Sequence, residues 1–538
     1  MNIVLLHPPR HFIGSRYGIS YQIPLGLVLI GGPLSDAGHN VALIDADAAG
    51  LDDEEIVRRL RGLGADLLMI GHNGSTAAHP TVETTCRYVK QELPELPIVY
   101  GGVFPTFAHR AVMRHTPEID MIVRGEGEAT AVDLANTLAR GGDLADVDGL
   151  VWRTDGDVTT NKQRRPISNL DAFRPGWDLV DWSLYRLFGL APAAGIQFSR
   201  GCPYTCSYCG QWRFWRTYRH RSPRDFVDNV LLLKEEYGVK AVLPADEHFA
   251  ADRKVTEEVL DELIARNADT PLYINTTVKD ALRDEDIMHK YQQAGVVFAA
   301  VGVESDSPEV QMRINKGNAA TDSRQAVRLL RKHGILPLIH VIYGLENEDL
   351  GSLWRKYRFI IKMDPDFANL EYITPHFWTP LGRMARPEQV IQLDQRKWGY
   401  RNQVLAVPSM SPITLFLAVK LTELLVHVRP KTIARALFQR RRYVQDFRLK
   451  GLWHAFLMWS AEIVDFVRNT SFVKVGDATR DPKSLELLMG LSHHAVQADA
   501  TASREPAPAR EVRPASAFQA VLALWPLREC PVFGRFQH

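Results

Sequence analysis

The chain has 538 residues, of which 46% are hydrophobic and 24% charged, as is usual for globular proteins of two or three domains. Its 64 Lys and Arg residues balance 63 Asp and Glu residues, which excludes a global electrostatic attraction to nucleic acid or membrane. The N-terminal MNIVLLHP is too short for a secretory signal, and no uncharged apolar run is long enough to span a bilayer. We therefore expect a cytoplasmic protein, in which cysteines serve as ligands or catalysts more often than as disulfides.

The first 140 residues alternate short apolar runs with amphipathic helical segments. The strand-like runs cover residues 2–7, 41–47, 66–72, 97–102 and 120–128. This pattern predicts an α/β domain with a doubly wound parallel sheet of the flavodoxin or Rossmann kind. Gly101-Gly102 and Gly125-Glu126 follow two of the strands, at the edge where such folds bind ligands and where glycine lets the backbone approach them closely.

Residues 141–190 read as a linker, with a hairpin around Asp155-Gly156. A second alternating series fills residues 191–385 and predicts a partial (β/α)6 barrel of the TIM type. Its strand candidates are residues 195–200, 240–246, 272–277, 296–305, 337–344 and 368–375. In such barrels the chemistry lies at the carboxyl ends of the strands. In this chain a cysteine-rich loop directly follows the first strand candidate.

The remainder of the chain has no strand pattern. Residues 386–494 predict a helical region, and residues 495–538, rich in Ala, Pro and Arg, predict a disordered tail. The basic run QRRRY at 439–443 has two interpretations. Its side chains are either solvated charges on the surface of a helix or contacts with an anionic membrane surface.

Cys202, Cys206 and Cys209 form a Cys-x3-Cys-x2-Cys loop. A structural zinc site takes four ligands, and a Cys3His site with His220 would need a ten-residue gap after the last cysteine. Three thiolates on a [4Fe–4S] cluster leave one iron without a protein ligand. That iron can chelate the amine and carboxylate of S-adenosylmethionine, whose reductive cleavage releases a 5′-deoxyadenosyl radical.

The spacing of the cysteines, with the aromatic Tyr208 before the last of them, resembles the signature of the radical S-adenosylmethionine superfamily. The resemblance implies three contacts with S-adenosylmethionine. An acidic pair contacts the methionyl amine, the GVES run lies near the ribose, and a glycine after the fifth strand packs against the adenine. The resemblance also implies an electron donor such as flavodoxin or ferredoxin. The residues of this chain that match these superfamily elements are Tyr208, Asp246, Glu247, Gly302, Glu304 and Gly344.

The N-terminal domain resembles the cobalamin-binding module that often precedes such barrels. Modules that bind cobalt through a lower histidine ligand carry a DxHxxG motif, which this sequence lacks. We therefore interpret His7, His72 and His79 as loop or core histidines. The implied cobalamin contacts are Gly101, Gly102, Gly125 and Glu126. A resemblance to tRNA methylthiotransferases fails, because their N-terminal domain carries three further cysteines and this one has only Cys86, which we expect to be buried and inert.

Within this class the chain is similar to the anaerobic magnesium-protoporphyrin IX monomethyl ester cyclase family of bacteriochlorophyll biosynthesis. The similarity covers roughly residues 1–385, and its most specific stretches are CSYCGQWRFWRTYRHRSP, LPADE, INTTVKDALRDE, GLENE and ITPHFWTPLG. The sequence departs from the family pattern at strand ends, where we expect contact with the pocket. These departures are Gly210, His248-Phe249, Thr277, the GVES run and His376-Phe377.

The resemblance implies an oxidoreductase that closes the fifth ring of a tetrapyrrole in a large, water-excluding pocket. The alternative is a cobalamin-dependent C-methyltransferase acting on a tetrapyrrole, a hopanoid or another hydrophobic scaffold. A nucleic-acid platform is a third reading, which the balanced charge disfavours. Side chains that would line the substrate pocket are Trp212, Trp215, Arg216, Arg219 and Trp378, and the alternative for each is an ordinary core or surface position.

Overall fold

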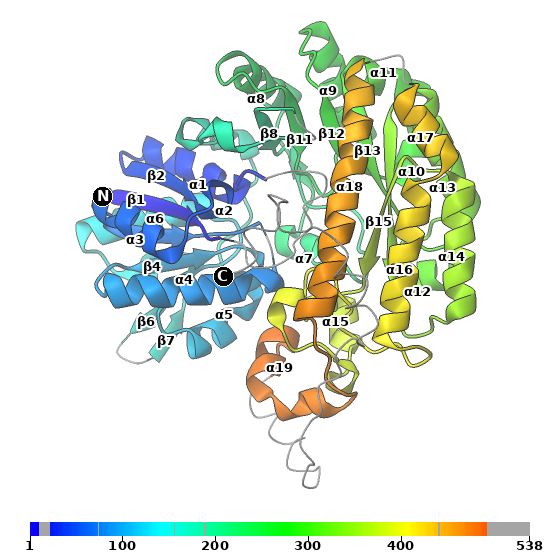
Figure 1. Ribbon diagram of the computed structural model, residues 1–538. Helices are drawn as coiled ribbons and strands as arrows, with labels where there is room; N and C mark the ends of the chain where they lie inside the picture. The colour runs from blue at the N-terminus through cyan, green and yellow to red at the C-terminus, as the bar shows by residue number, and fades with distance from the viewer. Residues whose placement is uncertain (10–21, 74, 155–156, 188–189, 439–441, 492–538) are drawn as a thin grey trace.

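The computed structural model describes residues 1–9, 22–73, 75–154, 157–187, 190–438 and 442–491. Two α/β units lie side by side, and long helices from the C-terminal region cover the front of the second unit (Figure 1). The predicted tail, the turn at Asp155-Gly156 and residues 439–441 of the basic run lie outside the described residues. None of the described helices has the length and apolar character needed to cross a membrane.

The first unit is built on a mostly parallel sheet with the order β2-β1-β3-β4-β5-β6-β7. Its five parallel strands are short and largely buried, as expected for a sheet covered on both faces. They are β1 (Asn2–His7), β2 (Asn40–Asp45), β3 (Leu67–Ile70), β4 (Ile98–Gly101) and β5 (Met121–Val123). The order 2-1-3-4-5 is that of the flavodoxin-like doubly wound fold, and it confirms the predicted fold class.

Helices connect these strands: α1 (Leu25–Asp36), α2 (Ala46–Ala49), α3 (Asp53–Gly62), α4 (His79–Glu92), α5 (Val103–His115) and α6 (Glu128–Arg140). Helix α3 shows why the sequence forms a helix here, since Asp52 caps its first turn, acidic residues follow and arginines occupy the last turn. The hairpin β6 (Leu150–Thr154) and β7 (Asp157–Thr160) adds two antiparallel strands to the edge of this sheet.

The second unit is an open parallel sheet with the order β15-β14-β13-β12-β11-β8, a half-barrel that confirms the predicted (β/α)6 architecture. Its strands are β8 (Ala193–Ile196), β11 (Ala241–Pro244), β12 (Leu272–Thr277), β13 (Val296–Glu304), β14 (Leu336–Tyr343) and β15 (Phe367–Tyr372). The helices between them are α8 (Pro223–Glu235), α9 (Arg253–Ala265), α10 (Val278–Arg283), α11 (Met288–Gln293), α12 (Pro308–Arg313), α13 (Ala320–Lys332) and α14 (Leu350–Met363).

The C-terminal region is helical, as predicted. Helices α16 (Pro412–His427), α17 (Pro430–Leu437) and α18 (Arg442–Asn469) lie against the open side of the half-barrel (Figure 1). A buried ion cluster fixes α16 to α18: Arg401 and Lys420 both pair with Glu423 and Glu462. The short helices α15 (Pro380–Met384) and α19 (Pro482–Met489) complete the region. Through Glu486, α19 binds Arg114 and His115 of α5 in the first unit.

Candidate active site

The three cysteines lie in the loop between β9 (Ser199–Arg200) and α7 (Gln211–Trp215), at the carboxyl edge of the half-barrel. Strand β9 pairs with the two-residue β10 (Arg219–His220), which closes the base of the loop. Gly201 begins the loop with φ +83°, and a Cβ at this position would lie 2.5 Å from the carbonyl oxygen of Thr217. Only glycine therefore fits where the backbone turns out of the barrel.

Burial raises the pKa of Cys202 to about 11 and that of Cys209 to about 12. Both thiols are therefore protonated at neutral pH, and a bound cation must stabilise the thiolates. Among the described residues, no three His, Cys, Asp or Glu side chains are grouped closely enough to hold a single metal ion. Three thiols distributed along one loop fit a cluster, whose ligands attach to separate corners.

The two carboxylates after β11 have different surroundings. Asp246 accepts hydrogen bonds from the backbone N–H groups of Phe198 and Ser199, so it fixes the strand that leads into the cysteine loop. Glu247 lies in the wall of the cavity beside Cys209. Burial raises the pKa of Asp246 to about 6 and that of Glu247 to about 7. Of the two, Glu247 is the carboxylate placed to meet a ligand, and its contact with the methionyl amine stays a prediction.

Glu304 ends β13 in a strained conformation, with φ +69° and a side chain that is almost fully buried. The hydroxyl of Tyr208 donates to its Oε1 atom at 2.8 Å, and Lys316 Nζ lies 3.1 Å from the same oxygen. Gly302 makes room for this cation, because a Cβ there would lie 2.6 Å from Lys316 Nζ. Although burial alone would lower the pKa of Lys316, Glu304 and the nearby cysteines raise it, so the lysine stays charged.

Gly344 follows β14 with φ +84°, a conformation that favours glycine. Its N–H donates to Glu348 Oε2 at 2.9 Å, which holds the loop at the carboxyl end of this strand. The strand end thus presents backbone without a side chain, which fits the predicted role of packing against an adenine ring.

A cavity of about 400 Å³ lies between the two units. Tyr208, Cys209, Gly210 and Glu247 line it from the half-barrel side, and His72 lines it from the first unit. Three aromatic residues, His376, Trp378 and Tyr400, also line this cavity and are called here the aromatic wall. The first two rings stack at 4.7 Å and 11°.

This aromatic wall has a fixed geometry. His376 lies 2.9 Å from Thr76 Oγ1 and 3.1 Å from the hydroxyl of Tyr400. Burial lowers the pKa of His376 to about 3, so the ring is neutral at physiological pH. Gly210 is required beneath it, because a Cβ there would lie 2.2 Å from Trp378 Nε1. The wall is therefore aromatic and uncharged.

A second cavity, of about 310 Å³, lies over the carboxyl edge of the first sheet. Gly101, Gly102, Gly125 and Glu126 contribute to its wall, and α7 covers it with Phe214 and Trp215. A Cβ at any of these three glycines would meet nothing within 4 Å, so the backbone faces open space. A glycine-lined cradle of this kind fits a large flat cofactor such as a corrin. The individual cobalamin contacts stay predictions.

Two of the three N-terminal histidines have hydrogen-bond partners, and the third, His79, packs against aromatic rings. His7 Nδ1 lies 2.9 Å from Asp45 Oδ1, and His72 Nε2 lies 2.7 Å from the hydroxyl of Tyr100. His79 is fully buried, and burial lowers its pKa to about 3. His7 and His79 are thus buried core residues, whereas His72 lies in the loop after β3 and lines both cavities, so its role stays a prediction.

Several residues predicted to bind ligands make contacts within the protein. Glu126 pairs with Arg200 at 2.8 Å and with Arg219 at 2.7 Å, which joins the first unit to the half-barrel. Trp212 donates its indole N–H to the Cys206 carbonyl oxygen at 3.2 Å. Arg216 is exposed at the end of α7. Of the predicted pocket set, Trp378 lines the first cavity and Trp215 the second.

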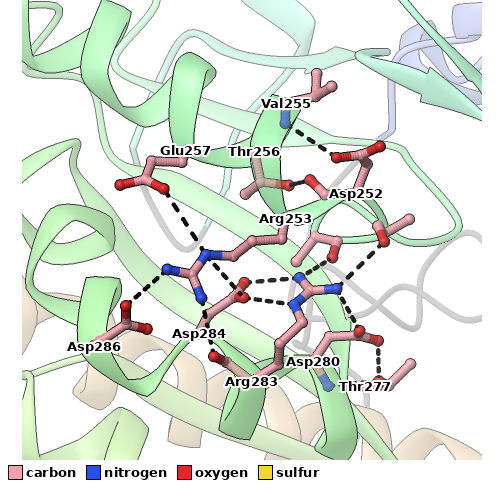
Figure 2. Close-up of polar contacts among 12 residues, drawn as sticks. Asp252, Arg253, Val255, Thr256, Glu257, Thr277, Asp280, Arg283, Asp284 and Asp286 are labelled. Carbon is pink, nitrogen blue, oxygen red and sulfur yellow. Dashed lines mark hydrogen bonds and ion pairs between the residues drawn. The ribbon is translucent and has the colours of Figure 1, made fainter.

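A buried polar network supports the cysteine loop from behind. Asp280 accepts hydrogen bonds from the hydroxyl of Tyr204, within the loop, and from Thr277, and it lies 2.8 Å from His248 Nε2. Figure 2 shows the continuation of this network, in which Arg283 bridges Asp280 and Asp284. Two of the departures from the family pattern, His248 and Thr277, therefore meet at one carboxylate, whereas Gly210 and His376 line the first cavity.

Sequence reasoning missed Lys316, Thr76 and Tyr400. Lys316 belongs to an ordinary-looking INKGN turn, and Thr76 is 300 residues from its partner His376. No local pattern signals such contacts. The contact of Thr76 depends on how the two units pack together, and those of Lys316 and Tyr400 depend on how separate strand-end loops of the second half of the chain meet.

Comparison with known proteins identifies both units. Residues 196–360 match the radical SAM superfamily, and residues 20–135 match the B12 binding domain. The fold is similar to that of the cobalamin-dependent S-adenosylmethionine radical enzyme OxsB with aqua-cobalamin and S-adenosylmethionine bound. That similarity has a TM-score of 0.64 at 17% identity and covers 93% of this chain and 80% of the other.

Two curated relatives cover most of the chain. The anaerobic magnesium-protoporphyrin IX monomethyl ester cyclase of Synechocystis sp. is 42% identical over 84% of this chain and 91% of its own length. The enzyme of the same name from Cereibacter sphaeroides is 32% identical over 85% of this chain and 75% of its own. The cofactors are a [4Fe–4S] cluster, S-adenosylmethionine and cobalamin. This radical S-adenosylmethionine enzyme with a B12-binding domain belongs to the family of anaerobic magnesium-protoporphyrin IX monomethyl ester cyclases.

Proposed function

We propose that the protein closes the fifth ring of magnesium-protoporphyrin IX monomethyl ester, or of a closely related tetrapyrrole, without molecular oxygen. The observation that carries this proposal is that the two cavities share a wall. The residues lining both are His72, Asn73, Val103, Gln211 and Glu247. A substrate in the first cavity would therefore lie next to the cysteine loop on one side and the glycine cradle on the other.

The side chains around the first cavity have distinct roles in this proposal. Cys202, Cys206 and Cys209 would hold the cluster, and Lys316 would pair with the carboxylate of S-adenosylmethionine. When bound, these two cofactors supply a carbon-centred radical that abstracts hydrogen from the substrate side chain. The stacked His376 and Trp378 would exclude bulk water from the macrocycle. A flavodoxin or ferredoxin would deliver the electron.

Anaerobic reconstitution with this porphyrin, a reductant and S-adenosylmethionine tests the proposal. We expect 5′-deoxyadenosine and a product with a fifth ring, whose ketone oxygen carries the label when the reaction is run in ¹⁸O-water. S-adenosylhomocysteine together with a methylated product would instead identify a methyltransferase and contradict the proposal. Cys206→Ala should lose both the cluster absorbance and the products. The control Cys86→Ala, in a fully buried helical position far from the loop in sequence, should keep both.

A further inference from the structure

Exposed apolar side chains gather on the C-terminal helices. Of the sixteen large hydrophobic side chains exposed in the described residues, nine lie between residues 417 and 453. Three are on α16 and Val428 directly follows it, three are on α17 or directly after it, and two are on α18. Single exposed leucines need no explanation, but a concentration of this kind marks a contact surface.

Helix α16 is apolar on two sides. Phe416, Val419 and Val426 are buried toward the half-barrel and α18, whereas Leu421 and Leu425 are exposed on the other side. A helix that is hydrophobic all round is normally covered all round. Within the described part of the chain, the outer side of α16 has no such cover, so the exposed side requires an apolar partner.

An apolar cavity of about 320 Å³ opens beside this surface. Its outer wall includes the exposed Val428 and Ile433, and its floor is formed by half-barrel residues such as Phe367. A row of aromatic rings leads from the surface to its wall: Trp453, which is 62% exposed, stacks with Phe456 at 5.8 Å, and Phe456 stacks with Trp459 at 6.3 Å. The apolar surface thus continues into the interior, an arrangement that is costly in water.

Positive charge surrounds the same helices. Beneath the surface, four arginines with side chains 10–25% exposed surround only two carboxylates, Asp364 and Asp366, and the arginines are Arg331, Arg429, Arg435 and Arg448. The exposed Lys431 and Lys450 add two cations and the exposed Asp446 one anion, so six positive charges face three negative ones. The whole chain, by contrast, has a net charge of only +1. Apolar side chains bordered by a local excess of cations complement anionic lipid headgroups above a hydrocarbon layer.

We propose that the face made by α16, α17 and α18, called here the lipid face, docks on the surface of a bilayer that contains anionic lipids. Trp453 and the exposed leucines of α16 insert below the headgroups, and the exposed Lys431 and Lys450 remain among them. Since no described helix is able to span a membrane, the contact is interfacial. The inference goes beyond ring closure and does not depend on it, because its test measures lipid binding and no turnover.

The experiment is co-sedimentation of the full-length, anaerobically purified holoprotein with phosphatidylcholine vesicles, with and without phosphatidylglycerol. The test variant is Leu417→Glu/Leu449→Glu, at two lipid-face positions that are each 40% exposed. The matched control is Leu63→Glu/Val158→Glu, at positions 40% and 41% exposed in the first unit. Both variants add the same charge at sites of equal exposure, so unfolding or general repulsion would affect them equally.

We expect the wild type and the control to bind phosphatidylglycerol vesicles, with weaker binding in high salt. The test variant should bind about tenfold or more weakly, since two leucines no longer enter the hydrocarbon. Equal binding by the two variants, or no vesicle binding by the wild type, would overturn the proposal. It would also be overturned by a dimer that only the test variant abolishes, or by binding that depends on residues 492–538 and not on the lipid face. Those results would assign the face to a second copy or the lipid contact to the tail.

Discussion

Glu304 shows how individual residues in the site are held against their own conformational preference. A non-glycine residue in the left-handed region costs about 1–3 kcal/mol and persists where its surroundings fix it. Here the fixing contacts are the hydrogen bond from Tyr208 and the ion pair with Lys316. Since Tyr208 directly precedes the last cysteine, the position of this carboxylate is coupled to that of the cysteine loop.

The open space in front of Gly101 leads to a prediction about cobalamin. Gly101→Ala should leave the fold intact, because the added methyl group meets no protein atom within 4 Å. The methyl group would intrude on a cofactor in the cradle and weaken binding by about 1–3 kcal/mol. Absorbance of cobalamin retained after desalting measures the effect. Gly62→Ala, also in open space but at the end of α3, is the control and should retain cobalamin. Full retention by Gly101→Ala would show that the cradle does not touch the corrin.

The raised pKa of Glu247 leads to a second prediction. Burial raises this pKa to about 7, so the carboxylate is mostly protonated at pH 6 and mostly charged at pH 8. If it accepts a hydrogen bond from the iron-bound methionyl amine, the affinity for S-adenosylmethionine should rise about tenfold over this range, because the charged carboxylate is the stronger acceptor. Calorimetric titration of the reconstituted protein measures the affinity. Glu247→Gln should bind weakly and independently of pH, and an unchanged pH profile in this variant would assign the dependence to another group.

At the same scale, local motifs made some site residues predictable and left others hidden. The cysteines, Tyr208 and Gly344 were recognisable because each belongs to a short motif at a strand end. Lys316 was not, because its role depends on Gly302, which lies fourteen residues earlier and leaves space for the lysine side chain. Glu126 was predicted from its glycine-rich loop, and no sequence pattern indicated that two arginines of the other unit bind it.

Among the elements, the buried ion cluster between α16 and α18 has the clearest energetic consequence. Glu462 is almost fully buried, and Arg401 and Lys420 hold its pKa far below the usual range, despite burial, which acts to raise it. Glu462→Gln would leave two cations with Glu423 alone, so we expect a loss of about 3–5 kcal/mol in unfolding free energy.

Urea unfolding measures this loss. Glu258→Gln, which removes an exposed partner 3.9 Å from Lys254, should change the unfolding free energy by at most about 1 kcal/mol. An equally small effect of Glu462→Gln would mean that water or a neighbouring group solvates the unpaired cations.

The elements themselves followed closely from apolar patterning. The eleven strand candidates of the two sheets all contain or overlap an observed strand, because short buried strands between amphipathic helices leave little ambiguity. The hairpin β6–β7 was predicted from its turn. Its pairing with β5 was not predicted, because the local sequence does not indicate which strand adds to the edge of a sheet. The outer side of α16 was equally unpredictable, because its sequence reads as that of a buried helix.

On the scale of the whole molecule, Arg200 holds the two units together. Its side chain is 3% exposed and pairs with Glu126 and Glu128 of the first unit. Arg200→Met keeps the aliphatic volume but leaves Glu128 buried without a cation, and we expect a loss of about 3–5 kcal/mol in unfolding free energy. Limited proteolysis of residues 141–190 should accelerate in parallel.

The matched control is Arg59→Met, which breaks an exposed pair with Glu55 on α3 and should cost at most about 1 kcal/mol. If Arg200→Met unfolds at the same denaturant midpoint as the wild type and its proteolysis is unchanged, the remaining contacts between the two units are enough to hold them together.

The anchoring of α19 on α5 adds a late attachment between the two units, because the chain has already returned to the first unit at His376, which lies beside Thr76. Such an attachment is intramolecular, so even a modest contact is occupied most of the time. The two units are therefore held together at several points along the chain. Separating them requires a local unfolding step that also releases α19.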